Sequence, residues 1–185
     1  MARLPQVSRE SVPENQRQAF DEIVSAAGSV PRYGPGSVAL HIPHAHQRLM
    51  GFNRFLRSDA SLPKKLQELA MLVTARELDC QYIWNAHAAS ARAAGVGDAL
   101  VDALRDRKEL TKLADDETAV VRFGQEFFRT HRVSRGTFQL ALEQLGQQGA
   151  IELGMFLGNY ASLALLVNSF DVDLPPDRKE PLLPV

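Results

Sequence analysis

Three side chains that could carry acid–base or thiol chemistry lie close together in the sequence: Glu68, Cys80 and His87. At 100° per residue, Cys80 and His87 share one face of a helix predicted over residues 79–94, two turns or about 10 Å apart along its axis. A substrate or a water would fit between them. The ordinary pKa of histidine is near neutral, so His87 is a candidate general acid or base. Cys80 lies at the predicted helix N-terminus, where unpaired amide groups favour a thiolate.

Each of these residues also has a purely structural interpretation. Cys80 could be a small buried hydrophobe, and His87 a core histidine with its hydrogen bonds satisfied. Glu68 lies at the edge of the apolar face of a helix predicted over residues 61–78, where it is either solvated or buried with a partner. Arg76 falls within that apolar face. It either extends its charge to solvent or offers a cation to an anionic ligand.

Metal binding has little support in the sequence. Cys80 and His87 supply two ligands at most, without the closely spaced pairs of zinc sites, so we predict no metal and no cofactor.

The single cysteine excludes an intrachain disulfide and suits a reducing compartment. Residues 1–10 lack the apolar run of a secretory signal, so we expect a cytoplasmic protein.

Charge and hydropathy argue against two classes of partner. Lys and Arg total 21 against 22 for Asp and Glu, and the net charge of -1 gives no field that would hold nucleic acid. The most apolar stretch, residues 150–170, contains Glu152, Asn159 and Asn168 and has no flanking basic clusters. We therefore interpret it as a core helix and expect no membrane association.

Helix-start and helix-stop signals recur along the chain, whereas strand alternation does not. The predicted helices cover residues 11–28, 43–57, 61–78, 79–94, 98–106, 115–128, 134–146 and 150–170. Residues 33–36, Tyr-Gly-Pro-Gly, contain too many helix breakers for regular structure and are predicted to form a loop. Four prolines in residues 171–185 predict an irregular tail. The sequence therefore predicts an all-α single domain, residues 1–185, with seven or eight helices.

The run of residues 66–95 resembles the signature of the carboxymuconolactone decarboxylase and alkylhydroperoxidase-D-like family. The peroxidase branch has Glu, eleven residues, then Cys-x-x-Cys-x-x-x-His, and Glu68, Cys80 and His87 occupy matching positions. Ile83 stands where that branch has its second, reactive cysteine.

The decarboxylase-like branch tends to show Tyr-Glu-Trp-x-x-His, which residues 82–87, Tyr-Ile-Trp-Asn-Ala-His, approximate. Ile83 here replaces its Glu. The resemblance extends weakly over residues 35–175 and implies a multi-helix bundle of the alkylhydroperoxidase-D-like type. It also implies a site, with catalytic candidates His87, Glu68 and Cys80 and substrate-binding candidates Arg76, Trp84, Ile83, His41 and His44.

Three functions remain open at this point. The first is cofactor-independent decarboxylation or proton transfer on a small carboxylated or lactone metabolite, with His87 as acid and Glu68 orienting it. The second is thiol-dependent peroxidase chemistry through Cys80, which would need an external thiol for turnover. The third is a helical oligomer that binds a ligand without catalysis.

The resemblance further implies a homo-oligomer, namely a dimer, trimer or hexamer. Residues 150–170 are apolar in too many directions for one chain to cover, and Gly154 and Gly158 would allow close helix approach. We expect part of this helix to contact another subunit.

Overall fold

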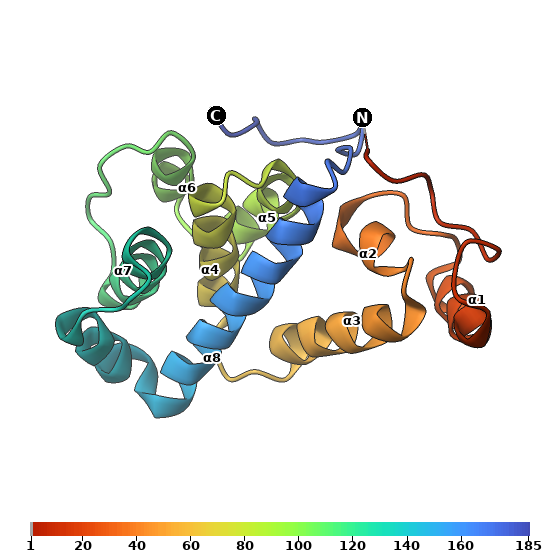
Figure 1. Cartoon of the computed structure of the whole chain (residues 1–185). Helices are drawn as coiled ribbons and strands as arrows, with labels where there is room; N and C mark the ends of the chain where they lie inside the picture. Colours follow the sequence, from red (N-terminus) through yellow and green to blue (C-terminus); the bar gives the residue numbers. More distant parts are fainter. Residues whose placement is uncertain (1) are drawn as a thin grey trace.

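The chain folds as an all-helical bundle in the computed structural model, which describes residues 2–185 (Figure 1). Met1, part of the predicted domain 1–185, lies outside the described residues. The all-α prediction is confirmed: helices are the only regular elements in the described part of the chain. The elements are η1 (Glu14–Gln16, a 3-10 helix), α1 (Arg17–Ala27), α2 (Gly34–Ala39), α3 (Pro43–Ser58), α4 (Lys64–Glu77), α5 (Gln81–Ala93), α6 (Asp98–Arg105), α7 (Asp115–Thr130) and α8 (Arg135–Ser169).

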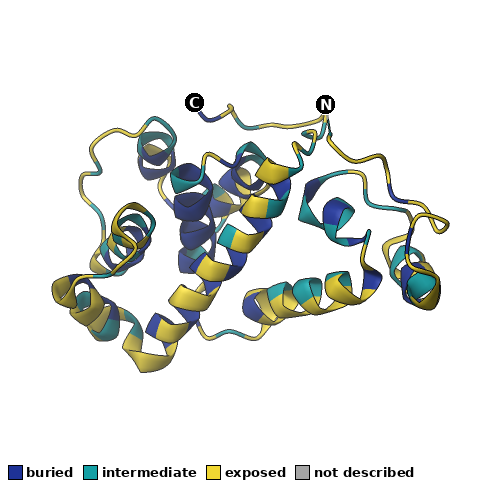
Figure 2. Cartoon of the chain, in the orientation of Figure 1, coloured by how far each residue is buried: buried dark blue, intermediate teal, exposed yellow. Residues whose placement is uncertain are grey.

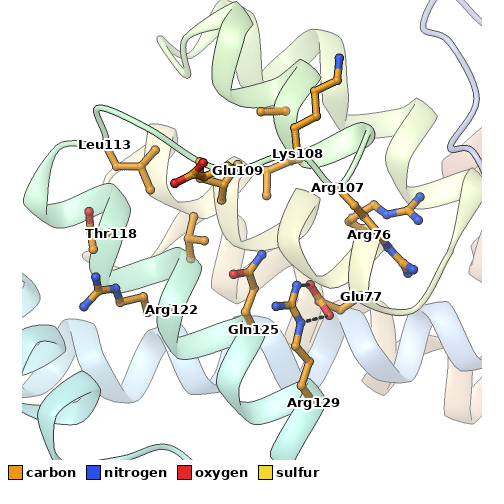
Figure 3. Close-up of a pocket in the computed structure, with 14 residues that line it drawn as sticks. Arg76, Glu77, Arg107, Lys108, Glu109, Leu113, Thr118, Arg122, Gln125 and Arg129 are labelled. Carbon is orange, nitrogen blue, oxygen red and sulfur yellow. Dashed lines mark hydrogen bonds and ion pairs between the residues drawn. The ribbon is translucent and has the colours of Figure 1, made fainter.

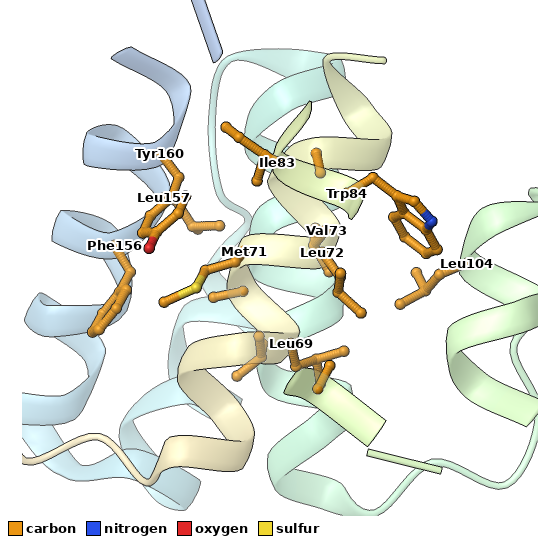
Figure 4. Close-up of a cluster of buried hydrophobic side chains, with 14 of the residues drawn as sticks. Leu69, Met71, Leu72, Val73, Ile83, Trp84, Leu104, Phe156, Leu157 and Tyr160 are labelled. Carbon is orange, nitrogen blue, oxygen red and sulfur yellow. The ribbon is translucent and has the colours of Figure 1, made fainter. Parts of the chain in front are cut away.

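Helix α4 forms the centre of the bundle, and α5, α6, α7 and α8 surround it. Every residue of Leu66–Arg76 is buried, so α4 has no solvent-facing side over that length (Figure 2). Gly124 of α7 permits a close approach, since a Cβ there would lie 2.6 Å from Val73 Cγ1. Figure 4 shows the core that results, with leucines of α4 between Trp84 on one side and Phe156 on the other.

The loop predicted over residues 33–36 is wrong, because α2 begins at Gly34. Pro35 stands in the first turn, where its missing N–H costs nothing. Gly34 has φ +75°, and a Cβ at this position would collide with the ring of Tyr82. The glycine therefore starts a helix whose first residue contacts Tyr82 of α5, which local sequence does not reveal.

Helix α8 is kinked at Gly146, which has φ 68° and ψ 176°. The break agrees with the prediction of separate helices over residues 134–146 and 150–170. By length and composition α8 is apolar enough to cross a membrane, and 56% of its most apolar window is buried inside this fold. A core helix has the same properties, so α8 alone carries little weight as a membrane span.

The two chain ends lie on the same side of the molecule (Figure 1). At the N-terminal end, the Arg3 N–H donates to the Phe170 carbonyl. The C-terminal tail returns to α5, where Leu183 is buried and the side chain of Gln81 bonds both its N–H and its carbonyl, each at 2.8 Å. The tail thus contributes a residue to the core. The remaining helices, α1, α2 and α3, pack together on the far side of α8.

Candidate active site

The tight α4–α5 connection brings Glu68 and His87 together. Asp79 adopts φ 49° and the Cys80 N–H donates to the Ala75 carbonyl, which turns the chain so that α5 packs back along α4. Glu68 Oε2 then lies 2.8 Å from His87 Nδ1. Both residues are buried, with exposed fractions of 0% and 9%.

Lys64 contacts the other oxygen of the same carboxylate. Its Nζ lies 2.7 Å from Glu68 Oε1, one helical turn away on α4, and half of its side chain is exposed. Burial acts to raise the pKa of Glu68, but hydrogen bonds and positive charge from His87 and Lys64 outweigh it and lower that pKa. Glu68 is therefore a buried, ionised carboxylate with both oxygens engaged.

The ionised carboxylate determines which nitrogen of the His87 imidazole carries the proton. A carboxylate only accepts hydrogen bonds, so His87 Nδ1 carries a proton and its N–H donates a hydrogen bond to Glu68. Nε2 remains to take up or release a proton. The ring of Tyr160 meets the imidazole edge-on, with centroids 5.3 Å apart, and Phe156 stacks on Tyr160. Burial raises the pKa of Tyr160 far above its usual value, so its phenol stays neutral beside the pair.

A cationic cavity of about 390 Å³ opens beside Lys64, at the C-terminal end of α3. Its lining consists of Met50, Asn53, Arg54, Arg57, Ser58 and Lys64. The charge of Arg57 acts on Tyr160, and Asn53 Oδ1 accepts a 2.9 Å hydrogen bond from Asn159 on α8. Lys64 therefore belongs both to the cavity and to the buried pair, and three cations face an anion that enters there.

Cys80 is not joined to the Glu68–His87 pair. It is the N-cap residue of α5, fully buried, and about 10 Å along the helix axis from His87. Burial raises the pKa of the thiol, although the amides of Ile83 and Tyr82 act to lower it. Desolvation therefore outweighs the amide dipoles that favour a thiolate at this helix N-terminus, which agrees with the interpretation of Cys80 as a small buried residue.

Two further candidates are core residues. Ile83 and Trp84 have exposed fractions of 2% and 0%. Trp84 lies beside Leu104, on the opposite side of α4 from Phe156 (Figure 4), and its indole N–H has no partner among residues 2–185. In this chain both residues pack α5 against its neighbours, and neither lines the cavity at Lys64.

The other predicted substrate-binding residues lie away from the pair. Arg76 lines a different cavity, between α4 and α7. His41 is half-buried and lines a third cavity, of about 610 Å³, with residues of the N-terminal segment. His44 is exposed, and its backbone N–H donates to Gln16 Oε1.

Sequence reasoning missed Lys64 and Arg57 as site residues. Lys64 stands four positions before Glu68, the spacing of helical ion pairs, so its contact could have been predicted. Arg57 comes from another helix and reaches the site only through tertiary packing.

The helices that carry the site match a known protein family. Residues 43–126 fit the profile of the carboxymuconolactone decarboxylase family. Over this segment the chain resembles that family. The segment contains Glu68, His87 and Cys80, together with Lys64 and Arg57. No curated protein matches the chain significantly.

Several solved structures share the fold. A peroxidase-related protein from Ralstonia eutropha JMP134, described as an alkylhydroperoxidase AhpD core, is 18% identical with a TM-score of 0.72, covering 95% of this chain and 93% of that one. A peroxidase-related protein from Silicibacter sp. TM1040 is 13% identical with a TM-score of 0.72, covering 96% and 93%. A Cys-to-Ala variant of the debrominase Bmp8, in complex with 2,3,4-tribromopyrrole, is 13% identical with a TM-score of 0.68, covering 95% of each chain. At these identities the likeness establishes the alkylhydroperoxidase-D-like fold alone.

Proposed function

We propose that this protein is a cofactor-independent enzyme that decarboxylates, or transfers a proton on, a small carboxylated or lactone metabolite. The observation that carries the proposal is the buried 2.8 Å contact between His87 Nδ1 and an ionised Glu68. A carboxylate on one ring nitrogen orients the imidazole and stabilises its protonated form, which prepares the other nitrogen for proton transfer.

Besides substrate binding, decarboxylation requires a group that protonates the carbanion left behind. As the bond to the carboxylate carbon breaks, its electron pair stays on the substrate carbon as an enolate or carbanion. His87 Nε2–H delivers a proton there, and Glu68 stays ionised beside the imidazole. The neutral Tyr160, with Phe156 stacked on it, borders the histidine and limits access of bulk water.

The cavity beside Lys64 suits an anionic substrate. Arg54, Arg57 and Lys64 place three cations around about 390 Å³, the scale of a small metabolite. His87 does not line this cavity, and Lys64, which contacts Glu68 at 2.7 Å, is the link between a carboxylate held there and the buried pair.

The thiol alternative has less support. Cys80 is fully buried, its pKa is raised, and no second cysteine is present in the sequence. A sulfenic acid formed at Cys80 would depend on an external thiol that reaches a buried atom. What favours this alternative is the shared fold with peroxidase-related proteins, which establishes no activity.

A proton-transfer assay tests the proposal. The protein is incubated in deuterated water with a panel of small carboxylated lactones, including carboxymuconolactone, and carbon dioxide release and deuterium incorporation are followed by NMR. We expect turnover of at least one compound, with deuterium at the carbon that bore the carboxylate. Neither carbon dioxide release nor deuterium incorporation with any compound of the panel would contradict it.

A further inference from the structure

Arg76 is a buried cation whose hydrogen bonds are incomplete. It is 3% exposed, and Nη2 donates to the Pro184 carbonyl and lies 3.1 Å from Asp79 Oδ1. Its Nε and Nη1 have no partner within residues 2–185. Unpaired donors on a buried charged group are costly, so Arg76 carries a charge that the described residues satisfy only in part.

A cavity of about 480 Å³ adjoins Arg76, between α4, the α6–α7 connection and α7 (Figure 3). Its charged lining residues are Arg76, Arg107, Lys108, Arg122, Arg129, Glu77 and Glu109. Five cations thus face two carboxylates, in a chain whose net charge is only -1. Gln125 and Thr118 add neutral hydrogen-bonding groups to the same wall (Figure 3).

The nearby carboxylates do not neutralise all of this positive charge. Glu77 is held by Arg129 through two contacts of 2.9 and 2.5 Å (Figure 3). Asp79 is shared between two cations, Arg76 and Arg107, at 3.1 and 3.0 Å. A single carboxylate between two guanidinium groups leaves a surplus of one charge.

Arg122 adds further charge at the opposite wall of the cavity. The carboxylate close to it, Glu126, is already engaged by the Ser134 N–H and the Thr137 hydroxyl, at 2.8 and 2.7 Å. Of the two lining carboxylates, Glu109 is exposed to solvent. Lys108 is paired with Asp106 at 3.0 Å, so the positive charge at this wall lies with Arg122, which also acts on Glu126.

We propose that this cavity is a second ligand site, which binds a small multivalent oxyanion such as a phosphate ester or a polycarboxylate. Guanidinium groups match the oxygens of both classes in planar, two-pronged hydrogen bonds. The site is separate from the Glu68–His87 pair, since Arg76 follows Glu68 by eight residues, about 12 Å along the axis of α4. It does not depend on the function proposed above.

Isothermal titration calorimetry with pyrophosphate and with citrate tests the proposal, using sodium chloride at matched ionic strength as the blank. We expect saturable binding at this cavity, and the tighter of the two anions identifies the phosphate or the carboxylate class. Arg122→Gln removes one charge-assisted contact from an exposed helix position, so it should weaken binding about tenfold. Arg132→Gln, an exposed arginine outside the cavity lining, should leave affinity unchanged.

Two more variants test whether the anion binds at Arg76 and not at the Glu68–His87 pair. Arg76→Lys keeps the charge but loses the planar fork, so affinity should fall with the fold retained by circular dichroism. His87→Ala should bind the anion as the parent does. The proposal is overturned by saturable binding of neither anion, by equal affinity in Arg122→Gln and Arg132→Gln, or by loss of binding in His87→Ala.

Discussion

At the scale of single residues, the charge of Glu68 controls what His87 can do. The carboxylate is desolvated, and it stays ionised because His87 and Lys64 each contact one of its oxygens. An amide in the same place would still accept a hydrogen bond from Nδ1–H, but it would not stabilise the protonated ring.

Glu68→Gln separates these two contributions. We expect kcat/KM for proton transfer to fall about a hundredfold, because His87 loses the charge that supports its protonated form. The measurement is the pH profile of kcat/KM for both proteins. An unchanged rate and profile would show that the carboxylate has only a packing role.

The same variant tests the pH dependence of stability. The pKa of Glu68 is lowered in the folded chain from an ordinary value of 4.5, so its contribution is fully present above pH 4.5 and is lost as the pH falls through the folded value. Urea unfolding should show the parent more stable than Glu68→Gln at pH 7, with a gap that narrows below pH 4.5. A gap independent of pH would contradict the lowered pKa.

The sequence predicts those site residues that local helical spacing or the family signature places, and it does not predict those that tertiary packing brings in. Helical spacing placed His87 on one face with Cys80, the family resemblance added Glu68, and a four-residue spacing could have led to Lys64. Arg57 comes from the preceding helix and Tyr160 from α8, far along the chain, and both reach the site by packing between helices, which no helical spacing indicates. Cys80 followed a local rule about helix N-termini that burial overrode.

At the scale of elements, the C-terminal tail acts as part of the core although it has no regular structure. Leu183 is buried in the main hydrophobic cluster, and the side chain of Gln81 holds its backbone from both sides. The four prolines of residues 171–185 indicate an irregular tail. They do not indicate that the tail is held by Gln81, because that contact depends on where α5 begins.

Leu183→Ala should therefore lower the free energy of unfolding by about 2 kcal/mol, the low end for a buried leucine, since a tail can relax into the space. Chemical denaturation measures it. Leu182→Ala is the matched control, because Leu182 is 43% exposed, and it should change stability little. Equal effects of the two substitutions would contradict the anchor.

The boundaries of the other elements show where local signals suffice. The stop predicted at Gly146 appears as the kink in α8, since a glycine with positive φ ends a helix by itself. By contrast, α2 was missed because Gly34 is needed for contact with Tyr82, which lies far along the chain.

At the scale of the whole molecule, part of α8 is unusually apolar for a solvent-facing surface. Ile151, Met155 and Leu165 are 52%, 42% and 66% exposed, and a Cβ at Gly154 or Gly158 would meet nothing within 4 Å. We propose that a second copy of the chain covers this face, in keeping with the oligomer expected from the sequence.

Light scattering at micromolar concentration should give a mass that is a multiple of the 20.4 kDa chain. Gly158→Leu should reduce it, because the added side chain holds two backbones apart. Gly136→Leu, at another open glycine in the first turn of α8, is the control and should leave the mass unchanged. A parent mass near 20.4 kDa would rule out the assembly.

The central claim is that His87, oriented by Glu68, carries the proton and that Cys80 does not act. The direct test compares turnover of one accepted substrate by His87→Ala and Cys80→Ser. We predict that His87→Ala loses at least about a hundredfold in rate, whereas Cys80→Ser stays within about tenfold of the parent. The opposite pattern, with His87→Ala active and Cys80→Ser inactive, would contradict the account and identify the buried thiol as the reacting group.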